Sequence, residues 1–193
     1  MQKYLNAIII ILILVIGFSC TSENKSEVDK RNMLFNFDST RVEKAVLLGD
    51  SGIQVNPPKG MVDFTAQIND KSPILSQLPF NVAKENCSLY FNQENNSVMI
   101  TSYSPVPLEV RQLEITGNMP LQLNSKDSFI KDGISFYQYV YSDTKNVMLV
   151  ILIPDHNIVF DIIYMIPRES YNEYSRNIES SLGSVIKKEV KKV

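Results

Sequence analysis

The stretch from residue 134 to residue 166 reads ISFYQYVYSDTKNVMLVILIPDHNIVFDIIYMI, and it decides the fold class. Three runs rich in β-branched and aromatic residues, Ile134 to Ser142, Val147 to Ile153 and Ile158 to Ile166, are separated by two short polar links. Such runs are typical of strands. Because a four-residue link returns the chain beside itself, we expect three antiparallel neighbours. The middle run is continuously apolar, which predicts a central strand covered on both faces. Asp161 interrupts the third run.

An earlier hairpin extends the predicted sheet. Ser88 to Phe91 and Ser97 to Tyr103 flank a polar five-residue turn, so the sheet reaches at least five strands. Ile53 to Val55 is a further predicted strand. Two other segments, Ile74 to Ala83 and Leu108 to Thr116, fit short helices or irregular structure.

A helix is predicted near the end of the chain, from about Tyr171 to Lys188. Ser170 and Glu173 have the spacing of a capping box, which satisfies backbone donors of a first helical turn. Apolar residues then recur at steps of three and four and form one stripe that should pack on the sheet: Tyr171, Tyr174, Ile178, Leu182, Val185 and Ile186. The closing basic cluster is expected to be a solvated helix end: Lys187, Lys188, Lys191 and Lys192.

The N-terminus predicts export and lipidation. After Lys3, the apolar run Ala7 to Phe18 is long enough for a signal-peptide core but shorter than the roughly 20 residues of a membrane-spanning helix. Small Ser19 then precedes Cys20, so residues 17–20 resemble a lipobox, and we expect cleavage before Cys20 and lipid on its sulfur. Simple secretion with an incidental cysteine is the alternative.

The chain therefore divides into a signal peptide at 1–19, a lipidated cysteine and polar flexible tether at 20–32, and a single α+β domain at 33–193. Thr21, not aspartate, follows the predicted lipidation site. In an organism with two membranes, this favours the outer membrane over the inner one. The lipid on Cys20 would hold the domain to that membrane.

Composition excludes several classes of function. With 19 basic residues against 21 acidic ones, the net charge of −2 gives no general attraction for nucleic acid. The single histidine, His156, and two cysteines cannot supply a zinc site. Asp127 and Asp132 lack the spacing of a calcium loop, so we expect no metal and no cofactor. With Cys20 lipidated, Cys87 has no disulfide partner and is expected to be a small core residue.

Residues 50 to 190 resemble the Mog1/PsbP-like family of α/β/α sandwiches. The resemblance rests on the segment 52–60, a short strand followed by a Pro-x-Gly turn, and on the segments 171–174 and 178–182 near the end. Met61 stands where many members have an aromatic residue. The resemblance implies a central antiparallel sheet with helices packed on it, and proteins that act mostly as accessory or binding subunits. It transfers no catalytic residue.

The segment from Ala45 to Ser51 resembles the nucleophile block of the GDSL hydrolases. A serine esterase would need a histidine oriented by an aspartate. The family places these as Asp-x-x-His, whereas Ile153 stands three residues before His156 and Asp155 adjoins it. We therefore prefer a strand end turning at glycines and keep an esterase centred on Ser51 as a distant third hypothesis.

Three tyrosines are the remaining candidate site. Alternation places Tyr137, Tyr139 and Tyr141 on one face of their strand and Phe136 on the other. They could line a groove for glycan, peptide or protein, although tyrosines packed beneath a helix are our preferred interpretation. The leading functional hypothesis is a non-enzymatic envelope lipoprotein that binds a protein partner as an accessory to a membrane-associated complex. A small-ligand or glycan-binding lipoprotein is the alternative.

Overall fold

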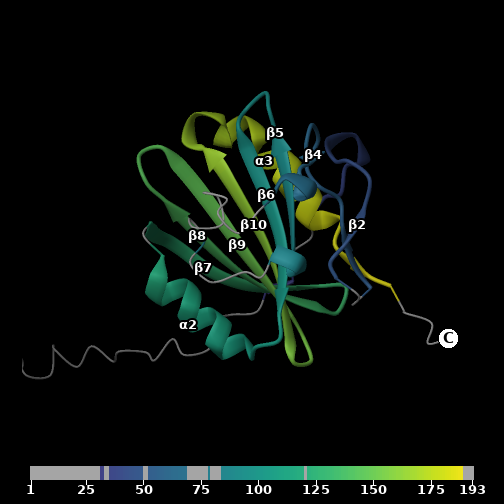
Figure 1. Cartoon of the computed structure of the whole chain (residues 1–193), viewed down its shortest axis with the longest axis vertical. Coiled ribbons are helices and arrows are strands. Elements are labelled where there is room, and N and C mark those ends of the chain that lie inside the picture. Colours follow the sequence, from purple (N-terminus) through teal and green to yellow (C-terminus); the bar gives the residue numbers. More distant parts are fainter. Residues whose placement is uncertain are drawn as a thin grey trace, which may run out of the picture.

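The computed structural model describes residues 31–32, 35–49, 52–68, 78, 84–119 and 121–188. Its centre is an eight-stranded sheet (Figure 1). In spatial order the strands are β1 (Arg31–Asn32), β7 (Gln122–Lys131), β8 (Ile134–Ser142), β9 (Asn146–Asp155), β10 (Ile158–Pro167), β6 (Ser97–Ser104), β5 (Cys87–Asn92) and β4 (Val62–Asp63). All neighbours are antiparallel except β1 and β7.

In the described part of the chain, a second sheet and two α-helices complete the sandwich. The small sheet consists of β2 (Val46–Leu47), β3 (Ile53–Val55) and β11 (Ile186–Lys187), with β3 in the middle. The α-helices described are α2 (Leu108–Asn118) and α3 (Arg168–Gly183). Among the described residues, three short 3₁₀ turns lie in the connections: η1 (Ser39–Arg41), η2 (Thr65–Gln67) and η4 (Lys84–Asn86).

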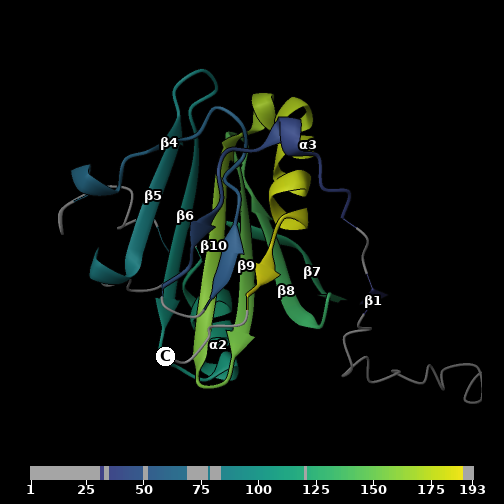
Figure 2. The ribbon, with the colours of Figure 1, turned by 90° about the vertical axis from the view of Figure 1, so that its right-hand side faces the viewer.

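The main sheet has an apolar core on each face because strand side chains alternate. In β10, Phe160, Ile162 and Tyr164 point to the core shared with α3 and the small sheet. Val159 and Ile163 point to the core shared with Ile115 of α2. Figure 2 shows α3 and the small sheet in front of the main sheet, and α2 behind its lower part. β9 is buried through Val147–Ile153, as predicted for a strand covered on both faces.

The predicted strands are confirmed. β8 has the predicted bounds, β9 and β10 extend the predicted runs at their ends, and β5 pairs with β6 as an antiparallel hairpin. β3 is also a strand, but it belongs to the small sheet. The segment Leu108 to Thr116 is helical, within α2. The α+β fold class with an antiparallel central sheet is therefore correct.

The bounds and cap predicted for the last helix are wrong. α3 begins at Arg168, directly after Pro167, and no side chain caps it, so Ser170 lies inside the helix. Proline fits here because its fixed φ suits a helix start. The helix ends at Gly183, since Ser184 turns the chain and Ile186 pairs with Gln54 of β3.

The predicted apolar stripe is confirmed for the residues within α3 and is wrong at Ile186, beyond the end of the helix. Tyr174, Ile178 and Leu182 are buried against the sheet, whereas Ile186 is 41% exposed on β11. The basic cluster is accordingly not a helix end: Lys187 lies in β11, where its Nζ is 2.8 Å from Oδ1 of Asp155.

Several predictions fall outside the described residues. They include the signal peptide, Cys20 with most of its tether, Ser51, Lys191 and Lys192. Of the segment Ile74 to Ala83, only Leu78 is described, and it is buried in the core on the α2 face. In the described part of the chain, no helix combines the length and apolar character that a membrane span requires.

Candidate functional site

The tyrosine face lies mostly inside the protein. Tyr139 is fully buried and Tyr141 is 2% exposed, while Tyr137 keeps partial exposure. The hydroxyl of Tyr141 donates to the carbonyl oxygen of Ile115 in α2 at 3.2 Å. Burial raises the pKa of Tyr139 to about 12, so its phenol is neutral at physiological pH. Tyr139 and Tyr141 thus form part of the core beneath α2, and only Tyr137 is available to a ligand.

A buried ion pair joins α2 to the face of the main sheet on which Tyr139 and Tyr141 lie. Arg111 in α2 donates through Nε and Nη2 to the two carboxylate oxygens of Asp161 in β10, at 3.1 and 2.6 Å. Ser102 donates to Asp161 at 2.8 Å, and Glu114 accepts from Arg111 at 2.9 Å. Burial raises the pKa of Asp161, and the contacts with Arg111 and Ser102 oppose that rise. The network is structural, and its sequence signal was the single acid within the apolar run of β10.

Of the residues considered for catalysis, His156 and Asp155 lie in the described part of the chain. His156 stands at the β9–β10 turn with its side chain 88% exposed, and its Nδ1 lies 2.8 Å from Oδ1 of Asp155. The same Asp155 oxygen accepts from Lys187. Ser51 lies outside the described residues. Among the residues that are described, no cluster of three or more His, Cys, Asp or Glu side chains could hold a metal ion.

Cys87 is a buried core residue, as predicted. It is 5% exposed in the core on the α2 face. Burial, with a smaller contribution from the Asp161 charge, raises the pKa of its thiol to about 11. Since the thiolate is the nucleophile, a thiol of this pKa is inert at neutral pH.

We therefore expect Cys87 to resist modification while the protein is folded. In a Cys20→Ala variant, a disulfide reagent at pH 7.5 should label Cys87 at least about 100-fold more slowly in the native protein than in 8 M urea, because burial and a raised pKa both withhold the thiolate. Release of the coloured thiol product measures both rates. Rapid stoichiometric labelling of the native chain would mean that Cys87 is accessible and reactive.

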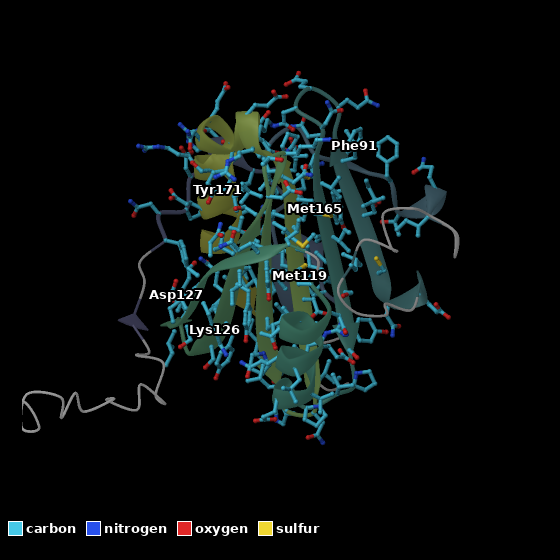
Figure 3. The ribbon with its side chains drawn as sticks, turned by 90° about the vertical axis from the view of Figure 1, so that its left-hand side faces the viewer. Phe91, Met119, Lys126, Asp127, Met165 and Tyr171 are labelled. Atoms are coloured by element: carbon cyan, nitrogen blue, oxygen red, sulfur yellow. The ribbon has the colours of Figure 1, made fainter. Side chains whose placement is uncertain are left out.

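The long edge of the main sheet at β7 is the feature most suited to binding. β8 pairs along one side of β7, whereas β1 pairs on the other side only at Phe129 and Ile130. Within the described chain, residues 122–128 have no strand on that side. This free edge, here called the β7 edge, is about 23 Å long. Figure 3 shows Lys126 and Asp127 at this border of the sheet.

The chemistry of the β7 edge is polar and exposed. Residues 122–127 are all exposed, and Leu123 is a 42%-exposed apolar side chain among them. A register shift lies between Leu123 and Ser125, and Nζ of Lys126 sits 5.3 Å from the ring centroid of Tyr139. Bulges and lysines at sheet edges limit indiscriminate strand pairing. Within the described chain, the β7 edge thus combines unpaired backbone groups with two features that limit indiscriminate pairing.

A wide hollow of about 760 Å³ lies at the start of this edge. It is lined in part by Gln122 and Asn124 of β7 and by Arg168 at the start of α3. Asn124 donates to the hydroxyl of Ser142 at 2.6 Å, and Arg168 donates to the carbonyl oxygen of Asp143 at 2.5 Å. Side chains of a strand added at the edge would meet amide, hydroxyl and guanidinium groups here.

Comparisons with known proteins identify the fold. No protein-family model matches the chain, and no curated protein matches it. The solution structure of cyanobacterial PsbP (CyanoP) from Synechocystis sp. PCC 6803 aligns with a TM-score of 0.53 and 8% identity, over 77% of this chain and 94% of that chain. A structure from Bacteroides thetaiotaomicron VPI-5482 aligns with a TM-score of 0.41 and 14% identity, over 78% and 50% of the two chains. The chain has a PsbP-like fold, as the sequence resemblance predicted.

Proposed function

We propose that this chain is an envelope lipoprotein, anchored through lipid on Cys20, that acts as a non-enzymatic accessory by binding another protein of a membrane-associated complex. The N-terminal apolar run ending at Cys20 supports the anchor, and the polar tether supports a domain held close to the membrane. In an organism with two membranes, Thr21 favours the outer one.

The observation that carries the binding role is the free β7 edge. An exposed edge recognises an extended peptide by forming backbone hydrogen bonds, and pockets beside it supply specificity. β1 already adds to this edge at Phe129 and Ile130, so the edge accepts a parallel strand. The hollow beside Asn124 and Arg168 would receive side chains of the added segment.

The described ionisable groups favour binding over catalysis. Asp161 and Arg111 are fixed in a buried ion pair, and burial keeps Cys87 protonated. His156 is exposed on a hairpin. The alternative of a ligand site on the tyrosine face gains no support, because Tyr139 and Tyr141 fill the core.

Photocrosslinking in intact membranes tests this function. With a photoreactive amino acid in place of Ser125 on the β7 edge, we expect one discrete crosslinked adduct of the anchored protein. The same amino acid in place of exposed Glu109 on α2 is the matched control and should give none. The Cys20→Ala form should lose both membrane retention and the adduct. Repeated failure to crosslink from any edge position, with protein present in the membrane, would reject the proposal.

Two proline variants then separate binding from folding. Successive residues of a strand direct their backbone N–H groups to opposite sides, so Lys126→Pro and Asp127→Pro remove one donor facing β8 and one facing outward. We expect one variant to be destabilised by about 3 kcal/mol and the other to remain within about 1 kcal/mol of the wild type. The stable variant should lose the crosslink. An unchanged adduct in that stable variant would show that the partner does not pair with β7.

A further inference from the structure

A second pocket, on the α3 face of the molecule, is separate from the β7 edge. It has a volume of about 480 Å³ and lies between four segments: η1, the turn after β3, the β5–β6 turn and the N-terminal half of α3. Its size suits a small ligand or a single long side chain. All of its lining residues are polar or glycine.

The floor of this pocket is built from buried polar side chains. Asn92 is 3% exposed and Tyr174 is 6% exposed. The Tyr174 hydroxyl donates to the carbonyl oxygen of Lys59 at 3.0 Å, and Asn92 donates to the same oxygen at 3.3 Å and to Tyr174 Oη at 3.4 Å. Asn92 Oδ1 accepts from the backbone nitrogens of Glu94 and Asn95. The floor is thus fixed before any ligand arrives.

Gly60 is required for this construction. Its φ is +83°, a conformation that favours glycine, and a Cβ there would lie 2.6 Å from Nδ2 of Asn92. Any other residue would displace the side chain that organises the floor. The Pro-x-Gly turn ending at Gly60 therefore shapes the pocket as well as the chain direction.

The two cations that line the pocket are each paired with an acid outside the lining. Arg41 and Lys59 line it, but each pairs with an acid that does not: Arg41 Nε lies 3.2 Å from Asp38, and Lys59 Nζ lies 3.4 Å from Glu43.

The two acids that line the pocket are Glu94 and Glu173. Among the described residues, neither carboxylate has a cation within salt-bridge distance. Burial raises the pKa of Tyr174 to about 12, and the charges of Glu43 and, to a smaller extent, Glu94 add to the rise. The lining itself holds two acids and two cations, and with Asp38 and Glu43 counted the pocket and its rim hold four acids against two cations. The hydrogen-bonding floor is neutral.

We propose that this pocket binds an organic cation, an alkylammonium or guanidinium group, with Glu94 and Glu173 as its counter-charges. Glu94 comes from the β5–β6 turn and Glu173 from α3, so the cation would be held between two walls. A metal ion fits less well, since no described group of three or more acidic, His or Cys side chains lies close enough together to hold one. The side-chain oxygens of Asn95 and Asn177 already accept from the Ser97 backbone at 3.0 Å and from Arg41 Nη1 at 3.3 Å, and each keeps a second lone pair for a ligand N–H group.

Calorimetric titration of the full-length chain in detergent tests this site. The probes are spermidine, arginine methyl ester and the blocked tripeptide acetyl-Ala-Lys-Ala-amide, at low ionic strength. We expect at least one probe to bind saturably, and Glu94→Gln and Glu173→Gln each to weaken it about tenfold, because each removes a charge-assisted contact. Both changes preserve shape, so the melting temperature should not move. Glu179→Gln, on α3 but outside the pocket, should keep wild-type affinity.

The probes also separate two sources of the cation. Tighter binding of spermidine would indicate a free polyamine, and tighter binding of the tripeptide would indicate a basic side chain of a partner protein. Either result supports the site. No binding of any probe at 10 mM, or binding that Glu94→Gln and Glu173→Gln leave unchanged, would overturn it. This test does not depend on the β7 crosslink.

Discussion

Arg111→Met should lower the free energy of unfolding by about 3–5 kcal/mol, because it leaves the buried carboxylate of Asp161 without its counter-charge. Asp161 is fully buried and Arg111 is 2% exposed, so water cannot replace the lost partner without opening the core beneath α2. Urea denaturation followed by circular dichroism measures the change. The matched control is Arg111→Met combined with Asp161→Leu, which removes both charges and should recover most of the loss. Equal destabilisation in the single and double variants would refute the explanation.

The same variant should show a pH dependence. Burial raises the pKa of Asp161 while Arg111 opposes the rise, so loss of Arg111 moves the folded-state pKa further above the unfolded value of about 3.9. An acid with a raised folded pKa binds its proton more tightly in the folded state. Stability is therefore greatest below the unfolded pKa and falls as pH rises towards the folded pKa. The deficit of Arg111→Met should be smaller at pH 4.5 than at pH 7. A deficit independent of pH would mean that loss of Arg111 does not raise the folded-state pKa of Asp161.

The antiparallel strands were predictable because their burial follows local pattern. Ile134 to Ser142 alternates, and Val147 to Ile153 is apolar throughout, so periodicity alone indicates how each strand meets the core. β7 was missed because it is an edge strand: residues 122–127 are exposed on both faces and show no apolar alternation. The one local sequence signal for β7 was the dipeptide Asp132-Gly133, which is typical of a two-residue hairpin turn. In the structure these residues have φ values of +50° and +76° and form the turn between β7 and β8.

The two proposed binding surfaces depend on tertiary placement and could not be predicted. The β7 edge is free because β1 pairs with only two residues of β7. The sequence of β7 alone does not indicate how much of the strand β1 covers. The polar pocket joins residues as distant as Arg41 and Asn177. The predicted capping box at Ser170 failed because Pro167 lets α3 begin one turn earlier, and tertiary packing of Tyr174 and Ile178 fixes the helix without a side-chain cap.

Tyr174→Asp is expected to cost about 4 kcal/mol or more of unfolding free energy. The substitution removes a buried aromatic ring between α3 and the sheet, and it places a shorter, charged side chain in the apolar core that the ring filled, short of the polar groups that the hydroxyl reaches. A buried carboxylate without a partner is costly, so the acid must either take up a proton or pull α3 away from the sheet. Thermal and urea unfolding measure the loss.

Two controls separate the contributions to that loss of unfolding free energy. Tyr174→Phe keeps the ring and leaves the Lys59 carbonyl with only Asn92 as a donor, so it should cost about 1–2 kcal/mol. Asn172→Asp, at an exposed position of the same helix, should stay within about 0.5 kcal/mol of the wild type. If Tyr174→Asp cost no more than Tyr174→Phe, α3 would not be held by this ring, and the apolar stripe would have to act through Ile178 and Leu182 alone.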